Sequence, residues 1–208
     1  ATEKEQVSYT IGMAMGKQLS EIKDEVNLDT VVKALRTQMA GEKVLVTDEQ
    51  AQKIMQAFGQ KMQAKQIAKM MEEGKLNQEK GDKFLAENGK KTGVVTTPSG
   101  LQYQVMTAGK GAKPTAADGV KVNYKGTLLD GKEFDSSYKR GEPAVLRLGG
   151  VIPGWSEGLQ LMQVGSKYKF WIPAKLAYGE QAPPMIGPNQ VLEFEVELLD
   201  IIKPNAAK

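Results

Sequence analysis

Apolar residues in the first part of the chain recur at the spacing of a helix face. This happens once in residues 7–19 and again in residues 28–39, and a period near 3.6 residues is typical of amphipathic helices. We expect two short helices, the second capped by Asn27 or Asp29 and ended near Gly41. The positions that define the two faces are Val7, Ile11, Ala14, Met15 and Leu19, then Leu28, Val31, Val32, Leu35 and Met39.

Two glycines interrupt the first of these helices. Gly12 and Gly16 stand four positions apart, and a glycine inside a helix costs about 1 kcal/mol relative to alanine. Close approach of another helix would compensate, and the alternative is a tolerated defect or a break. Two short amphipathic helices bury little core alone. We therefore expect them to pack against the other domain or, as the favoured reading, against a second copy of the chain.

A third, much longer helix is predicted after residue 46. Thr47 and Gln50 fit a capping box, and no proline follows before Asn88. A helix of that length measures about 60 Å. Its apolar stripe fades in the middle, which predicts a solvated spacer. The row Lys61, Lys65 and Lys69 indicates a solvated face rather than a nucleic-acid site, and the candidate bends are Gly74, Gly81 and Gly89.

The second half of the chain has the period of strands instead. Apolar and polar residues alternate in residues 99–106, 120–124 and 192–198, and residues 145–148 and 167–172 are further strand candidates. Residues 153–162 read as one short helix, closed by Gly165. About five strands and one helix predict an α+β unit with an antiparallel sheet wrapped around that helix.

Composition supports two regions of different class. All nine prolines lie at or after Pro98, and 15 of the 22 glycines follow residue 92. The net charge of +3 is unclustered and does not favour nucleic acid as a partner. The chain has no histidine and no cysteine. This excludes a Ser-His-Asp triad, a cysteine nucleophile, a disulfide and thiolate or imidazole metal sites.

The start of the sequence bears on its cellular location. No run of 18 apolar residues marks a membrane span, and the first residue is Ala1 rather than methionine. A secretory signal that has been removed would explain this start. Ordinary removal of the initiating methionine, or an arbitrary starting point, explains it equally well. The lack of cysteine is compatible with an oxidising compartment without demonstrating one.

Aromatic and branched residues beside turns are the candidate functional residues. Tyr124, Phe134, Trp155 and Tyr178 stand at strand ends or in loops, together with the pair Val151 and Ile152. Such positions often bind ligands, although the same residues would also serve as the core of a small domain. Periodicity alone leaves both interpretations open.

A family resemblance decides between them. Residues 122–137, 151–155, 177–179 and 194–199 occur in the order of the motifs of FK506-binding-protein peptidyl-prolyl isomerases, and this half of the chain resembles that family. Residues 8–16, followed by a long helix, resemble the bacterial Mip/FkpA-like subfamily. The resemblance implies isomerisation of prolyl peptide bonds, which breaks no covalent bond and needs no cofactor, metal, histidine or cysteine.

The resemblance also implies a role for each site residue. Trp155 would form the floor beneath the substrate proline, Asp135 and Tyr178 would supply polar contacts, and Arg140 would pair with Asp135. Ile186 belongs to the loop before the last strand. The implied walls are Tyr124, Phe134, Val151, Ile152 and Phe194. Ala144, Gly149-Gly150 and the short 180–188 loop depart from the family pattern and put macrolide affinity and substrate preference in question.

The subfamily further implies a V-shaped homodimer joined through its helical arms. The implied contact residues are Tyr9, Ile11, Gly12, Met13, Met15 and Gly16. We expect a dimerisation domain over residues 1–46, a connecting helix over 47–92, an isomerase domain over 93–204 and a tail over 205–208. The implied partners are proline-containing polypeptides and macrolides such as FK506 or rapamycin. The implied location is the periplasm or the outer membrane. A holdase chaperone, or less strongly a host-interaction factor, is the alternative function.

Overall fold

The computed structural model describes residues 1–204, so the predicted tail at 205–208 lies outside the described residues. Within it, the chain divides into two compact units, one ending at Met62 and one beginning at Gln63. The boundary falls inside the long helix. The domain limits expected from the sequence remain a prediction.

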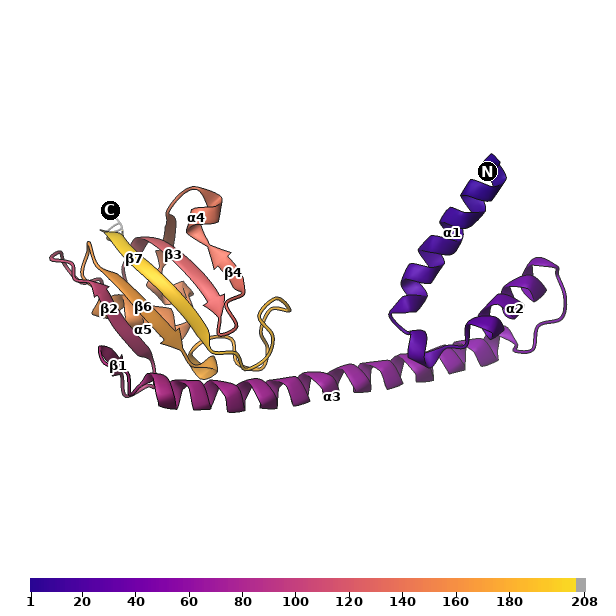
Figure 1. Cartoon of the computed structure of the whole chain (residues 1–208), viewed down its shortest axis with the longest axis horizontal. Helices are drawn as coiled ribbons and strands as arrows, with labels where there is room; N and C mark the ends of the chain where they lie inside the picture. The colour runs from indigo at the N-terminus through magenta and orange to yellow at the C-terminus, as the bar shows by residue number, and fades with distance from the viewer. Residues whose placement is uncertain (205–208) are drawn as a thin grey trace. The chain divides into compact units, whose positions relative to one another are not determined.

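The first unit is helical, as the sequence predicted. It contains α1 (Glu3–Ser20), the 3-10 turn η1 (Lys23–Glu25), α2 (Leu28–Met39) and the start of α3 (Asp48–Asn88), as Figure 1 shows. Thr2 caps α1 in a reciprocal box with Glu5. The Asn27 side chain accepts a hydrogen bond from the Thr30 backbone N–H at 2.9 Å. Of the two expected caps of α2, Asn27 is therefore the one used.

The residues of this unit remain accessible to solvent. None of residues 1–62 is buried, and Val7, Ile11 and Met13 each leave more than half of their surface exposed. A Cβ atom added to Gly12 or Gly16 would meet nothing within 4 Å. The described chain therefore supplies no packing partner for these two glycines, and the predicted contact with a second copy remains a prediction.

The long helix begins where the capping box predicted. The Thr47 hydroxyl accepts from the Gln50 N–H at 3.2 Å, and the Gln50 side chain accepts from the Thr47 N–H at 3.0 Å. The helix then runs without a break through Gly74 and Gly81 to Asn88. Gly74 and Gly81 therefore do not interrupt the helix, and the expectation of bends there remains a prediction. Gly89 directly follows the end of the helix.

The C-terminal part of α3 is not a solvated spacer either. Gly74, Gly81 and Asn88 are buried, and the Asn88 side chain donates to the Gln102 side-chain oxygen at 2.9 Å. Gln102 in turn donates to the Leu85 carbonyl at 2.7 Å. Because Gly74 and Gly81 have no side chains, the rest of the second unit can pack directly on the backbone of this part of the helix. This is why the sequence shows no apolar stripe there.

The second unit contains a seven-stranded antiparallel sheet in the order β1-β2-β6-β7-β3-β4, with β5 paired to β3. All five expected strands are present. The structure adds two short ones, β1 and β4, which were not expected. The strands are β1 (Val94–Thr96), β2 (Gln102–Thr107), β3 (Gly119–Leu128), β4 (Glu133–Ser136), β5 (Ala144–Arg147), β6 (Lys167–Ile172) and β7 (Leu192–Ile202).

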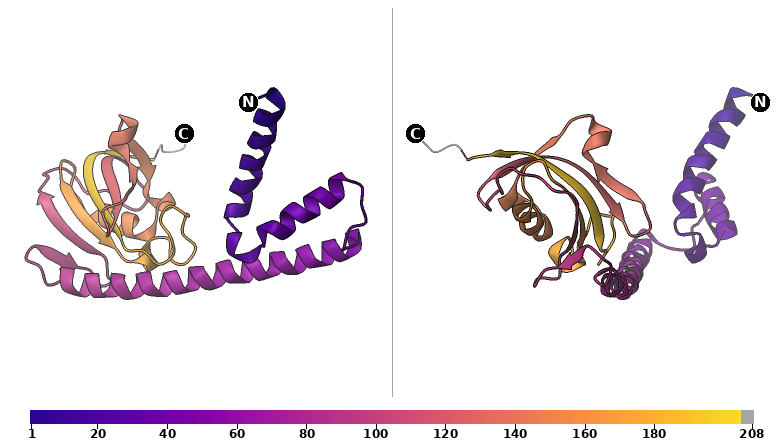
Figure 2. Two further views of the ribbon diagram at one scale, coloured as in Figure 1. Left: turned by 45° about the vertical axis from the view of Figure 1, so that its right-hand side comes forward. Right: turned by 60° about the vertical axis from the view of Figure 1, so that its left-hand side comes forward.

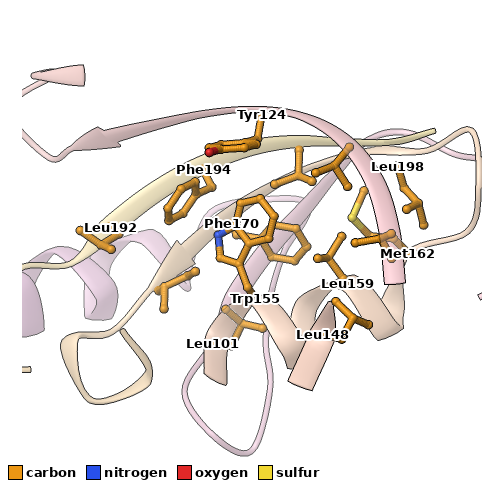
Figure 3. Packing of buried hydrophobic residues seen from close by; sticks show 14 of the residues in the cluster. Leu101, Tyr124, Leu148, Trp155, Leu159, Met162, Phe170, Leu192, Phe194 and Leu198 are labelled. Carbon is orange, nitrogen blue, oxygen red and sulfur yellow. The ribbon is translucent and has the colours of Figure 1, made fainter. Parts of the chain in front are cut away.

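The sheet curves around α5 (Pro153–Leu161), which lies on its concave side (Figure 2). Two glycines let α5 approach the strands closely. A Cβ at Gly158 would lie 2.7 Å from the Phe170 ring, and a Cβ at Gly154 would overlap Ile172. The core between helix and sheet contains Leu101, Leu148, Leu159, Met162, Leu192 and Leu198 (Figure 3). The predicted α+β architecture is confirmed.

Candidate active site

The predicted site residues come from seven separate parts of the second unit. Tyr124 is in β3, Phe134 and Asp135 are in β4, and Phe194 is in β7. Arg140 ends the short helix α4 (Ser137–Arg140), and Trp155 lies in the first turn of α5. Val151 and Ile152 join the 3-10 turn η2 (Leu148–Gly150) to α5, with Ile152 at its N-cap. Tyr178 and Ile186 lie between η3 (Ala174–Leu176) and β7.

Three of these aromatic rings meet edge to face at the centre. The Tyr124 and Trp155 ring centroids are 5.0 Å apart at 87°, and those of Trp155 and Phe194 are 5.2 Å apart at 89°. Phe134 packs on Phe194 in the same way at 5.5 Å. Such T-shaped pairs are favourable because the positive ring edge meets the negative face. Figure 3 shows Tyr124, Trp155 and Phe194 beneath the curved strands.

A glycine makes room for this aromatic cluster. A Cβ atom at Gly126 would lie 2.6 Å from Phe194 and 2.8 Å from Phe134. Gly126 is buried in the middle of β3, where glycine weakens a strand. Its presence is explained by the two rings that cross its backbone. This residue belongs to one of the predicted motifs, but no pattern in the sequence indicates its packing role.

A polar group of three side chains borders the rings. The Tyr124 hydroxyl donates to the Asp135 carboxylate at 2.6 Å, and Arg140 donates to Asp135 at 2.6 Å and to the Tyr124 oxygen at 2.7 Å. The Arg140 guanidinium also lies 5.4 Å from the centre of the Tyr124 ring. The expected pairing of Arg140 with Asp135 is present in the structure, and Tyr124 joins it.

This arrangement keeps Asp135 ionised and Tyr124 neutral. Burial alone would raise the pKa of Asp135, but the hydrogen bonds from Tyr124 and Arg140 and the Arg140 charge together outweigh it. The pKa therefore lies below its ordinary value of 3.8. Burial, followed by the hydrogen bond to Asp135, raises the pKa of Tyr124 above its ordinary value of 10.0. The Arg140 pKa is raised by its bonds to Tyr124 and Asp135.

A buried serine, missed by sequence reasoning, positions Tyr124. The Ser137 hydroxyl accepts from the Tyr124 backbone N–H at 2.9 Å, and Ser137 is completely buried. It therefore holds the start of α4 against β3. Its only sequence signal was its place in the 122–137 motif, because a serine after a strand is otherwise an ordinary helix-start residue.

The other predicted residues differ in exposure. Ile186 is 6% exposed and belongs to the core cluster, whereas Tyr178 is 42% exposed. Val151 and Ile152 are half-buried against the same cluster. The Ile152 carbonyl accepts from Trp155 and Ser156, and its N–H makes no backbone hydrogen bond within residues 1–204. A half-buried polar group of this kind is available to a bound ligand.

No group of three or more acidic residues suited to a metal ion occurs among the residues that the structure describes. In that same part of the chain, no helix has the length and hydropathy needed to cross a membrane. The site itself presents apolar surfaces, hydrogen bonds and one ion pair.

Comparison with known families agrees with this geometry. Residues 110–199 match the family described as FKBP-type peptidyl-prolyl cis-trans isomerase, and residues 4–105 match the domain amino terminal to that isomerase. The chain belongs to the FKBP-type peptidyl-prolyl cis-trans isomerases. The resemblance inferred from the four sequence motifs is confirmed, and so is the enzyme class.

Similar proteins extend the match to nearly the whole chain. The FKBP-type isomerase FkpA of Aeromonas hydrophila is 48% identical over 98% of this chain and 78% of that protein. The outer membrane protein MIP of Legionella longbeachae is 41% identical over 97% of this chain and 87% of that protein. The crystal structure of FkpA from Escherichia coli matches with a TM-score of 0.83 at 39% identity, covering 97% of this chain and 98% of the other.

Proposed function

We propose that this FKBP-type isomerase binds the proline of its substrate over the indole of Trp155. The observation that carries the proposal is the buried edge-to-face cluster of Tyr124, Trp155 and Phe194 beside the Asp135–Arg140 ion pair. Phe134, Val151 and Ile152 border the same cluster. An apolar ring such as proline suits an aromatic surface of this kind, and the ion pair marks its polar edge.

Prolyl isomerisation requires only rotation about the amide bond. A prolyl amide isomerises across a barrier of about 18–20 kcal/mol without breaking a bond. The planar amide is charge-separated and well solvated, whereas the twisted amide has lost that resonance. A dry aromatic surface therefore favours the twisted form, which is selective stabilisation of the transition state. The Tyr178 hydroxyl and the Ile152 N–H would hold the neighbouring carbonyls in the twisted geometry.

Asp135 acts in this proposal as a fixed charge. Its two oxygen atoms accept from Arg140 and Tyr124 at 2.6 Å each, so its orientation is set before substrate binds. The ion pair ties β4 to α4, and the Tyr124 hydroxyl ties both to β3. A carboxylate in this position would orient the substrate backbone beside the aromatic rings rather than move a proton.

We propose further that two copies associate through α1. All of residues 1–62 lack burial, although the unit exposes apolar side chains such as Tyr9, Ile11 and Met13. Gly12 and Gly16 leave the backbone of α1 open to close approach. A second α1 would cover these residues together with Met15, and a V-shaped homodimer with two isomerase domains is the arrangement we infer.

The clients we propose are exported proteins that fold in the bacterial envelope. Support comes from the similarity to a protein named as an outer membrane protein in Legionella longbeachae. Macrolides of the FK506 type would compete for the aromatic cluster. Ala144 is half-buried against the hydrophobic core and pairs with Val122 of β3, and a small residue there would leave one wall of a macrolide site incomplete.

A second candidate function is favoured by exposed apolar surface on α3. A groove of about 630 Å³ is lined by Ile67, Met70 and Met71 together with Pro188 and Asn189. Both methionines are exposed, Met71 more than Met70, and methionine side chains adapt to varied apolar partners. Holding unfolded chains on this surface would add a chaperone function to the isomerase.

One experiment measures the isomerase function and the holding function side by side. The rate of cis-trans exchange of a short proline peptide and the suppression of aggregation of an unfolded protein are measured for the full chain and for a chain that starts at Gln63. The shorter chain keeps the part of α3 that packs on the sheet. Peptide isomerisation should survive in both. The shorter chain also retains the groove at Ile67, Met70 and Met71, so suppression of aggregation should survive as well if that groove holds unfolded chains. Its loss in the shorter chain would contradict the groove and place the holding function in residues 1–62, and a full chain that fails to accelerate peptide exchange would refute the proposed isomerase mechanism.

A further inference from the structure

The C-terminal half of α3 packs against the segment that joins Tyr178 to β7. Gly74 faces Pro188 and Asn189, because a Cβ there would lie 3.4 Å and 3.2 Å from their side chains. Gly81 faces Val191, one residue before β7. Tyr178, at the start of this segment, and Ile186, within it, belong to the proposed substrate site. The helix backbone and the site therefore share one short stretch of chain.

Asn189 has an unusual conformation within this stretch. Its φ angle is 54°, and no other non-glycine residue among residues 1–204 has a positive φ. The left-handed region is unfavourable for residues with a Cβ, and asparagine tolerates it better than most. Such a conformation persists only where surrounding contacts hold it, and such positions concentrate at functional sites.

Two hydrogen bonds connect Asn189 to two different parts of the second unit. Its backbone N–H donates to the Gly179 carbonyl at 2.8 Å, which fixes the turn that follows Tyr178. Its side-chain Nδ2 donates to the Gly74 carbonyl of α3 at 3.3 Å. A neighbouring contact supports the second bond, since the Asn77 side chain donates to the Pro188 carbonyl at 2.9 Å.

The turn around Tyr178 is also anchored to η3, where the Ala177 N–H donates to the Ala174 carbonyl at 3.0 Å. The Gly179 N–H donates to the Ala174 carbonyl at 3.0 Å, and Gly179 itself has a positive φ of 59°. Tyr178 is 42% exposed, so core packing restrains its ring only partly. The bond from Asn189 to the Gly179 carbonyl ties the other side of this turn to the segment that packs on α3.

We propose that Asn189 is a positioning residue for Tyr178, fixed in place by the backbone of α3. This inference rests on the proposed role of Tyr178 in holding a substrate carbonyl. The side chain of Asn189 holds the residue on the helix, the left-handed backbone turns its N–H toward Gly179, and the turn then presents the Tyr178 hydroxyl. The docking of α3 thus contributes to catalysis without touching the substrate.

The test is a double-mutant cycle in the full chain. Asn189→Gly accommodates the positive φ but removes the bond to Gly74. Asn189→Asp keeps size and backbone preference but presents an acceptor to the Gly74 carbonyl. We expect each variant to lower kcat/KM for a proline peptide by roughly 3- to 10-fold, the value of one hydrogen bond. In a Tyr178→Phe background, the same substitutions should have almost no effect.

A matched control separates positioning from general loosening of the helix. Gln102→Leu breaks the bonds to Asn88 and Leu85 near the end of α3. It should lower stability, and any effect on kcat/KM should be the same with and without the Tyr178 hydroxyl. Equal, independent effects of Asn189→Gly in both backgrounds would overturn the proposal. So would a Gln102→Leu effect that also disappears with Tyr178→Phe, since docking in general would then be responsible.

NMR of the Tyr178 ring distinguishes failure of this inference from failure of the proposed function. If Tyr178→Phe is fully active but Asn189→Gly shifts the Tyr178 ring signals, the catalytic role of Tyr178 is wrong and the structural link stands. If the ring signals of Tyr178 do not move in Asn189→Gly, the link itself is wrong, whatever the activity of Tyr178→Phe.

Discussion

The Tyr124 hydroxyl donates a hydrogen bond to the Asp135 carboxylate over 2.6 Å. The same oxygen accepts from Arg140 at 2.7 Å, so one phenol joins an anion and a cation while its ring packs on Trp155. The polar edge and the apolar floor of the site thus share a residue. A substitution in the ion pair should therefore alter the packing of the aromatic cluster, and a substitution in the cluster should alter the geometry of the ion pair.

Replacing Arg140 by lysine should reduce activity more than stability. Arg140 and Asp135 leave 47% and 41% of their side chains exposed, and ion pairs with this much solvent contact contribute little to stability. Lysine cannot bridge Asp135 and the Tyr124 oxygen as the planar guanidinium does. We expect the urea midpoint of Arg140→Lys to change little and kcat/KM to fall several-fold. Unchanged kcat/KM would show that the bridge does not orient the site.

The pH dependence of catalysis should be flat from about pH 5 to about pH 8. The chain has no histidine or cysteine, and the pKa of Asp135 is lowered while that of Tyr124 is raised. Neither site group therefore titrates in this range. A bell-shaped profile of kcat/KM between those limits, at constant ionic strength, would contradict the fixed-charge role of Asp135.

Acid should destabilise the fold only below the ordinary carboxyl range. Asp118 accepts from the Thr115 backbone and from Lys203, which lower its pKa below 3.8, and the pKa of Asp135 is also lowered. A carboxyl with a lowered folded-state pKa stabilises the fold above its unfolded-state pKa. That contribution disappears as pH falls through the folded-state value. Urea midpoints should stay constant down to about pH 5 and decline below about pH 4.

Adding a methyl group at Gly81 should destabilise the second unit. Its Cβ would lie 2.8 Å from Val191, and overpacking costs about 1–3 kcal/mol, against a helix-propensity gain of about 1 kcal/mol. In a Val191→Ala background the clash is removed, so Gly81→Ala should become neutral or stabilising. Gly59 on the same helix has nothing within 4 Å of a Cβ and gives the control, because Gly59→Ala should stabilise. The urea midpoint is measured for the natural chain, the three single variants and the Gly81→Ala/Val191→Ala double variant.

Gly126→Ala should damage the aromatic cluster directly. The added methyl would overlap Phe194 and Phe134 at 2.6 Å and 2.8 Å, which displaces both rings at a cost of about 1–3 kcal/mol. We expect lower thermal stability together with a loss of isomerase activity measured well below the melting temperature. The exposed Gly149 has open space around a Cβ, so Gly149→Ala should leave activity unchanged. Full activity of Gly126→Ala would show that the two rings are not part of the site.

Large side chains on α1 should separate the proposed dimer. Gly12→Leu with Gly16→Leu would prevent close approach of a second helix, whereas Gly12→Ala keeps the surface small and favours the helix. Sedimentation equilibrium should give a dimer for the natural chain and for Gly12→Ala, and a monomer for the double leucine variant. A leucine variant that remains dimeric would place the interface elsewhere.

Local signals in the sequence predicted most elements of the fold. The capping box at Thr47 and Gln50 marked the start of α3, and the strict alternation in 192–198 marked β7. Strands β1 and β4 span only three and four residues, which is too short for a period to show. Their formation depends on the neighbouring strands that complete their hydrogen bonds.

The pattern of apolar and polar residues did not predict contacts between residues far apart in the sequence. Gly74 and Gly81 resembled bends because glycine weakens a helix, and their partners Asn189 and Val191 stand more than 100 positions away. The bridge of Tyr124 with Arg140 was likewise not contained in any periodicity. Motif resemblance singled out both residues, and only the three-dimensional arrangement joined the Tyr124 hydroxyl to the ion pair.

The most direct test of the isomerase mechanism is catalysis of a refolding reaction limited by prolyl isomerisation. The slow-phase rate is measured at increasing concentrations of the natural chain, Asp135→Leu, Tyr178→Phe and a control, Tyr138→Phe, whose ring is 52% exposed in α4. Acceleration should be strong for the natural chain and the control and at least several-fold weaker for the other two. Equal acceleration by all four proteins would contradict the assignment of Asp135 and Tyr178 to the active site.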